Sequence, residues 1–234
     1  MSVESLFASS PAPVRRGLRD DVYDRVLELL LSGALPPGAR LGIDRIASDL
    51  EVSPTPVREA LALLERTGLI TRELSKGYRV AQPLSIEQIN ELFDARLILE
   101  AGAMELAERA PEGLHAALLE AHAAHELAAQ QLLEVEDTMP VAVVQAYFAA
   151  DVRFHDVVRE FARNHFVSEM SVSLSTHLHL MRQTLRNGRS DVEFALVEHR
   201  AILDAVGSGV PGAGVAAMRE HITNVRGRAR AEAD

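Results

Sequence analysis

Cysteine is absent from the 234 residues of the chain. Without thiols the protein forms no disulfide bond and offers no thiolate to a metal or a substrate, which suits a reducing cytoplasm. No apolar run approaches the ~18–20 residues that cross a membrane, and residues 1–14 lack the hydrophobic segment of a secretory signal. We therefore expect a cytoplasmic protein with no membrane partner. Residues 1–14, rich in Ser, Ala and Pro, are expected to form a disordered leader.

Positive charge is also scarce, since 24 Lys and Arg face 34 Asp and Glu for a formal net charge of −10. The imbalance is confined to one part of the chain. Residues 15–80 hold 11 basic and 10 acidic side chains, whereas residues 81–234 hold 13 and 23. The first part is nearly neutral, so it can bind DNA only if its arginines gather on one surface.

A DNA-reading helix is predicted between residues 52 and 70. Its apolar residues recur at helical spacing, at Val57, Ala60, Leu61 and Leu64. Ser53 and Thr55 offer hydroxyl oxygens for capping its start, the nearby prolines suit a first helical turn, and Gly68 ends it. A shorter amphipathic segment, 46–51, precedes it across a tight turn. Two such helices in succession indicate a helix-turn-helix.

A wing is predicted after this helix pair. Residues 69–72 and 78–81 can pair as strands across 73–77, a basic segment that contains Gly77. The order helix, helix-turn-helix, strand, wing, strand predicts a winged helix over residues 15–83. Its second helix starts with small hydroxyl residues and an arginine, which suits an approach to base edges. We assign the DNA contacts to Arg45, Ser53, Thr55, Arg58, Lys76 and Gly77.

The remainder of the chain, residues 84–234, is predicted to be helical throughout, because no strand-like alternation appears after residue 83. Ser85 followed by Gln88 is the pattern of a capping box. About six helices are expected, over approximately 86–110, 112–136, 139–162, 164–185, 191–206 and 213–230. The fold class is therefore mainly α, with a winged helix-turn-helix followed by an all-α bundle.

Four residues of the predicted bundle could bind a metal ion. Asp151 and His155 are four residues apart and share one helical face. His199 and His221 lie on the fifth and the last predicted helices. If these helices converge, one carboxylate and three imidazoles would suit Zn, Ni, Mn or Fe. Spacing alone does not bring the helices together, and a single helical histidine is more often a packing or surface residue.

The other histidines are assigned to the surface or to packing. They are His115, His122, His125, His165, His177 and His179. His122 and His125 are three residues apart and could bind a metal, but the sequence suggests no third ligand within their reach.

Both parts of the chain resemble known families. Residues 22–83 resemble the winged helix of the GntR family of bacterial transcription regulators, through Leu35-Pro-Pro-Gly-Ala-Arg-Leu41 and Val52-Ser-Pro-Thr-Pro-Val-Arg-Glu-Ala-Leu61. The helical part resembles the FCD ligand-binding domain of the FadR-like subgroup, through Asp151-Val-Arg-Phe-His155 and Glu198-His-Arg-Ala-Ile202. The resemblance implies a homodimer that binds double-stranded operator DNA and responds to a small organic acid.

The FCD resemblance also implies roles for individual residues. The metal ligands would be Asp151, His155, His199 and His221. Arg96 would hold a carboxylate of the effector, although it could equally pair with Glu100 four residues later. Arg182 is a second candidate for effector binding.

The chain departs from the GntR pattern at the DNA-reading turn. Ser53-Pro-Thr-Pro56 replaces the usual Ser-Arg-Thr-Pro, which removes an arginine that often touches DNA. Glu51 occupies a position where glycine is common. These differences predict an unusual operator sequence or affinity.

The sequence therefore favours a metabolite-responsive transcription factor, a repressor and not an enzyme. Two alternatives stay open. One is a helical metalloenzyme that uses the Asp and His site, although no Glu, Tyr or Ser motif accompanies the ligands. The other is a DNA-binding protein whose histidines are purely structural.

Overall fold

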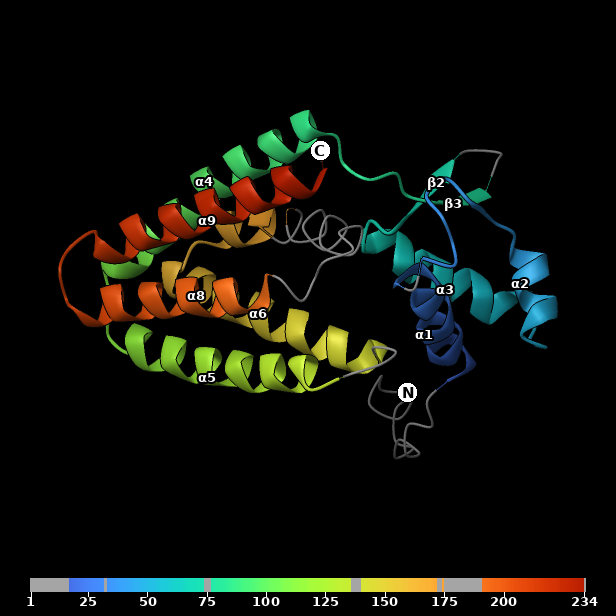
Figure 1. The fold of residues 1–234 in the computed structure, drawn as a ribbon, viewed down its shortest axis with the longest axis horizontal. Helices are drawn as coiled ribbons and strands as arrows, with labels where there is room; N and C mark the ends of the chain where they lie inside the picture. The colour runs from blue at the N-terminus through green and yellow to red at the C-terminus, as the bar shows by residue number, and fades with distance from the viewer. Residues whose placement is uncertain are drawn as a thin grey trace, which may run out of the picture.

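The computed structural model describes residues 17–31, 33–73, 77–135, 140–171, 174 and 191–233. Within these ranges a small first part and a larger helical part follow one another along the chain (Figure 1). The predicted leader, Lys76 and Arg182 lie outside the described residues.

The first part is a winged helix, as the sequence predicts. Its elements are α1 (Leu18–Leu31), β1 (Arg40–Leu41), α2 (Ile43–Asp49), α3 (Pro54–Arg66), β2 (Ile70–Glu73) and β3 (Gly77–Val80). The strands form an antiparallel sheet in the order β1-β3-β2, with Ile70 opposite Val80 and Arg40 opposite Arg79. β1 was not predicted, because two residues are too few to show alternation and their partner is distant in sequence.

The four apolar positions predicted for α3 form the centre of this part. Val57, Ala60, Leu61 and Leu64 are each 0% exposed. They pack against Val22 and Val26 of α1 and against Ile70 and Tyr78 of the sheet. Helical spacing of apolar residues is therefore sufficient to explain how α3 is fixed, with its polar face directed outwards.

The turn between α2 and α3 contains a left-handed residue. Glu51 has φ of 54°, a conformation that glycine adopts without the steric cost paid by a residue with a Cβ. This backbone geometry gives a physical reason for the glycine that is common at this position. The glutamate keeps the turn while it adds a negative charge beside it.

A capping box starts the helical part. The Ser85 side chain accepts a hydrogen bond from the Gln88 backbone at 3.2 Å, and the Gln88 side chain accepts one from the Ser85 backbone at 3.0 Å. Two backbone donors at the start of α4 are thereby satisfied, as the sequence predicts.

The helical part then contains α4 (Ile86–Glu108), α5 (Leu114–Leu133), α6 (Val141–Ala162), α8 (Val192–Gly207) and α9 (Ala213–Ala233). Residues 165–171 and 174 are also helical, and the rest of the predicted fourth helix lies outside the described residues. α4 packs on α6 and α9, while α5 packs on α6 and α8 (Figure 1). These contacts place the interior of the helical part between α4, α5, α6, α8 and α9.

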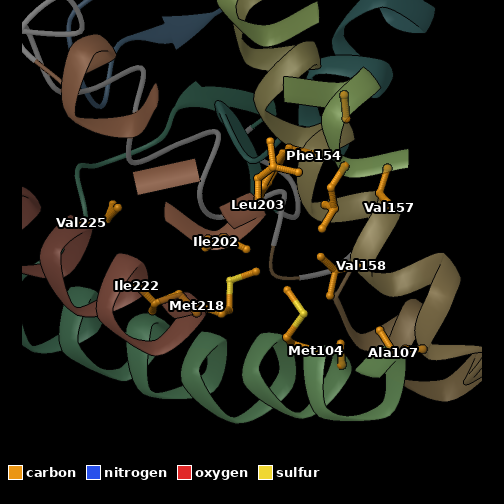
Figure 2. Close-up of a cluster of buried hydrophobic side chains, with 14 of the residues drawn as sticks. Met104, Ala107, Phe154, Val157, Val158, Ile202, Leu203, Met218, Ile222 and Val225 are labelled. Atoms are coloured by element: carbon orange, nitrogen blue, oxygen red, sulfur yellow. The ribbon is translucent and has the colours of Figure 1, made fainter. Parts of the chain in front are cut away.

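Part of this interior is an apolar core. Figure 2 shows Met104 of α4, Val158 of α6, Ile202 of α8 and Met218 of α9 within one cluster. Phe154 is fully buried in the same cluster and lies one residue before His155. The core thus fixes the helices that carry the predicted metal ligands. No helix of the described residues is long and apolar enough to cross a membrane.

Candidate functional site

The interior of the helical part contains an unusual number of buried ionisable side chains. Within the described residues they are Arg96, Glu100, His122, His125, Asp151, His155, Arg159, His199 and His221. Burying such groups is unfavourable unless they are paired or bind a ligand, so their concentration in one region indicates a site.

Three predicted ligands from three helices meet in this region. One ligand atom from each of His155, His199 and His221 lies within 4.8 Å of the others. Their ring centroids are 4.9–5.3 Å apart. All three side chains are buried, with His199 0% and His221 1% exposed. The convergence that spacing alone could not establish is therefore present.

Two of these imidazoles face carboxylates through Nδ1. His221 Nδ1 is 2.9 Å from Glu198 Oε2 in a hydrogen bond. His155 Nδ1 is 2.6 Å from Glu100 Oε2, an ion-pair distance at which the angle is not that of a hydrogen bond. The opposite nitrogens, Nε2 of His155, His199 and His221, are buried and have no hydrogen-bond partner.

Asp151 lies beside His199 and is not grouped with His155 and His221. Its Oδ1 is 3.9 Å from His199 Nε2. A second group of ligand atoms within 4.8 Å of one another comprises His125, Asp151 and His199. The four predicted ligands therefore belong to two overlapping triplets that share His199, and Asp151 is in the triplet with His125.

The electrostatic environment favours neutral imidazoles at His199 and His221 and ionised carboxylates at Glu100 and Glu198. Burial lowers the pKa of His199 well below its usual range, and burial likewise lowers that of His221. Burial alone would raise the pKa of Glu198, but hydrogen bonds from Arg228 and His221 lower it to about 2. Burial would also raise the pKa of Glu100, but Arg96 and His155 lower it well below its usual range.

These features fit a divalent metal ion. A neutral imidazole offers its Nε2 lone pair when Nδ1 carries the proton, and a carboxylate facing Nδ1 holds the ring in that tautomer. Imidazole nitrogens and one carboxylate are the donor set expected for Zn, Ni, Mn or Fe. Three buried nitrogens without hydrogen bonds would gain a partner from such an ion.

Arg96 forms the predicted ion pair with Glu100, which was one of its two expected roles. Its Nε donates to Glu100 Oε1 at 2.6 Å, and its guanidinium carbon lies 5.1 Å from the centroid of the Phe93 ring. The side chain is 1% exposed, yet its Nη1 has no hydrogen-bond partner. Pairing with Glu100 therefore leaves one donor of Arg96 for a ligand, so the two alternatives are compatible.

Sequence reasoning missed two residues of this region. His125 was assigned to the surface or to packing without a third ligand in reach, but it is 0% exposed and shares a triplet with Asp151 and His199. Arg159 is 7% exposed and contacts Asp156. The available signal for His125 was its position three residues after His122 on α5, which places both imidazoles on one helical face. Arg159 follows His155 by one helical turn, which could have placed it on the same face.

The predicted DNA contacts of α3 are exposed. Ser53, Thr55 and Arg58 lie at its N-terminal end with their side chains outside the core. Ser53 is the N-cap residue, but its side chain makes no capping hydrogen bond, contrary to expectation. Pro54 occupies the first turn, where no backbone donor is needed.

The remaining predicted DNA contacts lie on α2 and in the wing. The Arg45 side chain is 88% exposed, with Nε 3.7 Å from Asp49 Oδ2. Gly77 is exposed at the start of β3 with φ of 84°. Arg79 lies on the same strand but is held within the protein, because its Nη1 donates a hydrogen bond to the Gly38 carbonyl at 3.0 Å.

A winged helix with an exposed α3 N-terminus, joined to a helical domain with a buried ionisable cluster, defines a two-domain DNA-binding regulator. Comparison with known families agrees: the FCD domain matches residues 91–224, and the bacterial regulatory proteins of the gntR family match residues 18–80. The chain belongs to the GntR family of transcriptional regulators and carries an FCD domain.

Individual relatives are similar over most of their length. The HTH-type transcriptional regulator YdhC of Bacillus subtilis is 26% identical over 79% of this chain and 78% of its own. The "Probable D-xylose utilization operon transcriptional repressor" of Paenarthrobacter nicotinovorans is 29% identical over 92% of this chain and 90% of its own. These relatives are regulators and not enzymes, so they lend no support to the metalloenzyme alternative.

Solved structures show the same fold. The Escherichia coli protein McbR/YncC superposes with a TM-score of 0.62 at 21% identity, over 94% of this chain and 100% of its own. At this identity the likeness concerns the arrangement of helices and strands alone.

Proposed function

We propose that this regulator is a metal-dependent repressor whose helical domain senses a small organic acid. The ion would be held by Asp151, His155, His199 and His221. The observation that carries the proposal is the set of three buried Nε2 atoms without hydrogen bonds, on rings that direct Nδ1 to other side chains. His122 Nδ1 is also buried without a hydrogen bond, so the convergence of the three histidines, together with these free Nε2 atoms, supports a metal site over purely structural histidines.

The effector would be a carboxylate. When bound, the metal supplies a Lewis acid that can accept a carboxylate oxygen at an open coordination position. Arg96 would bind the same ligand through Nη1, while Glu100 keeps its guanidinium in place through Nε. Arg182 remains a predicted second contact outside the described residues.

The DNA-binding form would be a homodimer. Two winged helices then occupy successive turns of the major groove about 34–36 Å apart. Each head would use Ser53, Thr55 and Arg58 on α3, Arg45 on α2, and Lys76 with Gly77 in the wing. An effector that binds one arrangement of heads and helical domains more tightly than another shifts the equilibrium between them. A repressor role is consistent with the name of the Paenarthrobacter relative.

The metal component is tested by measuring bound metal in the purified protein by mass spectrometry. The wild-type protein is expected to carry one divalent ion per chain, and His199→Ala and His221→Ala are expected to lose it. His165→Ala is the matched control, because this side chain is 75% exposed and lies outside the cluster. Unchanged metal content in both cluster variants would leave the histidines with a purely structural role.

The regulatory component is tested by gel-shift experiments with DNA from the region around the protein's own gene. The protein should shift a specific fragment, and the affinity should change when an organic acid is added or a chelator removes the metal. Failure to bind any fragment specifically would refute the operator role. Specific binding that neither acids nor chelator alter would refute only the sensor role.

A further inference from the structure

We infer that His125 is a positioning residue of the metal site: it accepts a hydrogen bond from Nδ1 of His199 and thereby directs Nε2 of His199 to the ion. This inference rests on the proposed metal binding at Asp151, His155, His199 and His221. His125 would touch neither the ion nor the effector.

The contact between the two rings is close and fully enclosed. His125 Nδ1 and His199 Nδ1 are 3.2 Å apart, and both side chains are 0% exposed. The His199 ring is also stacked on Phe154, with centroids 4.0 Å apart and planes 8° from parallel. Phe154 therefore fixes the plane of the His199 ring, while His125 occupies the position opposite its Nδ1.

The protonation states follow from this geometry. Two nitrogens 3.2 Å apart form a hydrogen bond only if one carries the proton and the other accepts it. His199 can give its Nε2 lone pair to a metal only when its own proton is on Nδ1. His199 is then the donor and His125 Nδ1 the acceptor, so His125 carries its proton on Nε2. Tyr147 packs on the His125 ring with centroids 4.9 Å apart and helps to hold it in place.

Nδ1 of each of the other two imidazoles lies opposite a carboxylate, in a hydrogen bond only at His221. His155 faces Glu100, and His221 faces Glu198. Residues behind a metal-binding histidine fix its tautomer and orientation, and their loss typically lowers metal affinity about 10–100-fold. His125 provides this support with a neutral ring. It therefore orients His199 without adding a third negative charge to the two outer carboxylates.

A direct metal-binding role for His125 would make a different prediction. His125, Asp151 and His199 form their own triplet of ligand atoms. If this triplet bound a second ion, the protein would take up two ions per chain. Metal stoichiometry separates this arrangement from an outer role for His125.

Two substitutions separate the acceptor of His125 from its volume. His125→Asn can place an amide oxygen near the position of Nδ1, whereas His125→Leu fills comparable space without an acceptor. His125→Gln carries the amide one bond further from the backbone and serves as a geometric comparison if the leucine variant does not fold. His165→Leu is the control on an exposed histidine.

The experiment titrates the metal-free full-length protein with Co(II) in competition with a chromophoric chelator and records the d–d absorption. The wild type should bind one ion per chain. His125→Leu should bind it about 10–100-fold more weakly with an altered spectrum, while His125→Asn should stay within about threefold of the wild type, as should His165→Leu. If only the amide variants fold, His125→Gln should bind more weakly than His125→Asn.

Several outcomes would overturn the role of His125. Wild-type affinity and spectrum in His125→Leu, or equal affinity in the asparagine and glutamine variants, would show that His125 does not position His199. Two ions per chain, with one lost in every His125 variant, would make it a ligand of a second site. If the wild type binds no Co(II), the proposed metal site itself fails, which is distinguishable from a bound ion that is indifferent to His125.

Discussion

The two domains bury opposite kinds of residue. In the described part of the winged helix, the core contains apolar side chains and Tyr78, and no charged or histidine side chain is buried. In the helical domain the apolar core around Phe154 adjoins a buried group that includes Arg96, Asp151 and His199. A domain that reads DNA needs its polar groups outside, whereas a domain that encloses an ion or an acid needs some of them inside.

This difference explains why the domains should respond differently to the same kind of change. Apolar packing determines whether the winged helix folds, and its exposed residues determine what it binds. In the helical domain the buried ionisable groups of the proposed site are expected to affect both properties, because they are inside the core and would also bind the ligand. The predictions below separate the two domains on this basis.

The largest effect is expected from Leu61→Ala at the centre of the winged helix. This side chain is 0% exposed, and such a truncation typically costs about 2–5 kcal/mol of unfolding free energy. DNA binding should be lost as this domain unfolds, while metal content is retained. Urea unfolding, gel shift and metal analysis measure the three properties. Leu119→Ala on α5 is the control, because this side chain is 47% exposed. Loss of metal in Leu61→Ala would contradict the separation of the domains.

Acid should destabilise the helical domain of the metal-free protein selectively. Burial lowers the pKa of His199 and His221, so below about pH 6.5, the usual histidine pKa, the unfolded chain binds more protons than the folded one. The unfolding free energy should therefore fall as pH decreases, by up to ~1.4 kcal/mol per pH unit for each histidine. Well above pH 6.5 both groups are neutral in both states, and this dependence should vanish.

Amide hydrogen exchange at pH 7.5 and 5.5 resolves this effect by domain. Residues 1–80 contain no histidine, so protection of the winged helix should change much less than protection of α6, α8 and α9. Equal loss of protection in both domains would contradict a contrast based on buried imidazoles. The His165→Gln variant should retain the wild-type pH dependence, because this histidine is exposed.

Arg58→Ala should affect the winged helix only through its ligand. Arg58 is exposed on α3, so its loss should leave the unfolding free energy within about 0.5 kcal/mol. If it contacts a base, operator affinity should fall by about 1–3 kcal/mol, or roughly 5–150-fold. Fluorescence anisotropy with labelled operator DNA measures the affinity. Arg109→Ala in the helical domain removes the same charge and should bind normally; equal weakening by both variants would indicate a general charge effect.

Ser85→Ala should give the smallest change, at the junction of the two domains. Removing an N-cap hydroxyl typically costs about 0.5–2 kcal/mol, here from the helical domain whose α4 it starts. Chemical denaturation at pH 7.5 measures this loss. Ser48→Ala, an exposed position on α2 without a capping role, should cost less than about 0.5 kcal/mol. Equal stability of the two variants would mean that the capping box contributes little to the helical domain.

The same contrast explains what the sequence could predict. The winged helix follows from apolar spacing in α3 and from turn signals, which are local, and only the two-residue β1 was missed. The helical segments that the structure describes were also predicted, together with the capping box at Ser85. The convergence of His155, His199 and His221 could not follow from spacing, because it depends on how three helices pack.

His125 shows the limit of local patterns most clearly. On α5 it lies three residues after His122, and the sequence suggests no third ligand for this pair. Its significance arises from contact with His199, 74 residues later. Two roles were predicted for Arg96, an ion pair with Glu100 and binding of an effector carboxylate. The i, i+4 pair can be seen in the sequence, but coordinates are needed to show that Nη1 has no hydrogen-bond partner.

X-ray diffraction from crystals of the metal-loaded protein, recorded above and below the absorption edge of the ion, tests the central proposal most directly. A single anomalous peak per chain is predicted among Nε2 of His155, His199 and His221, within coordinating distance of Asp151 and with His125 behind His199. A loaded crystal whose anomalous peak lies elsewhere, or whose three histidines bind only water, would contradict the proposal that this buried cluster is a metal site.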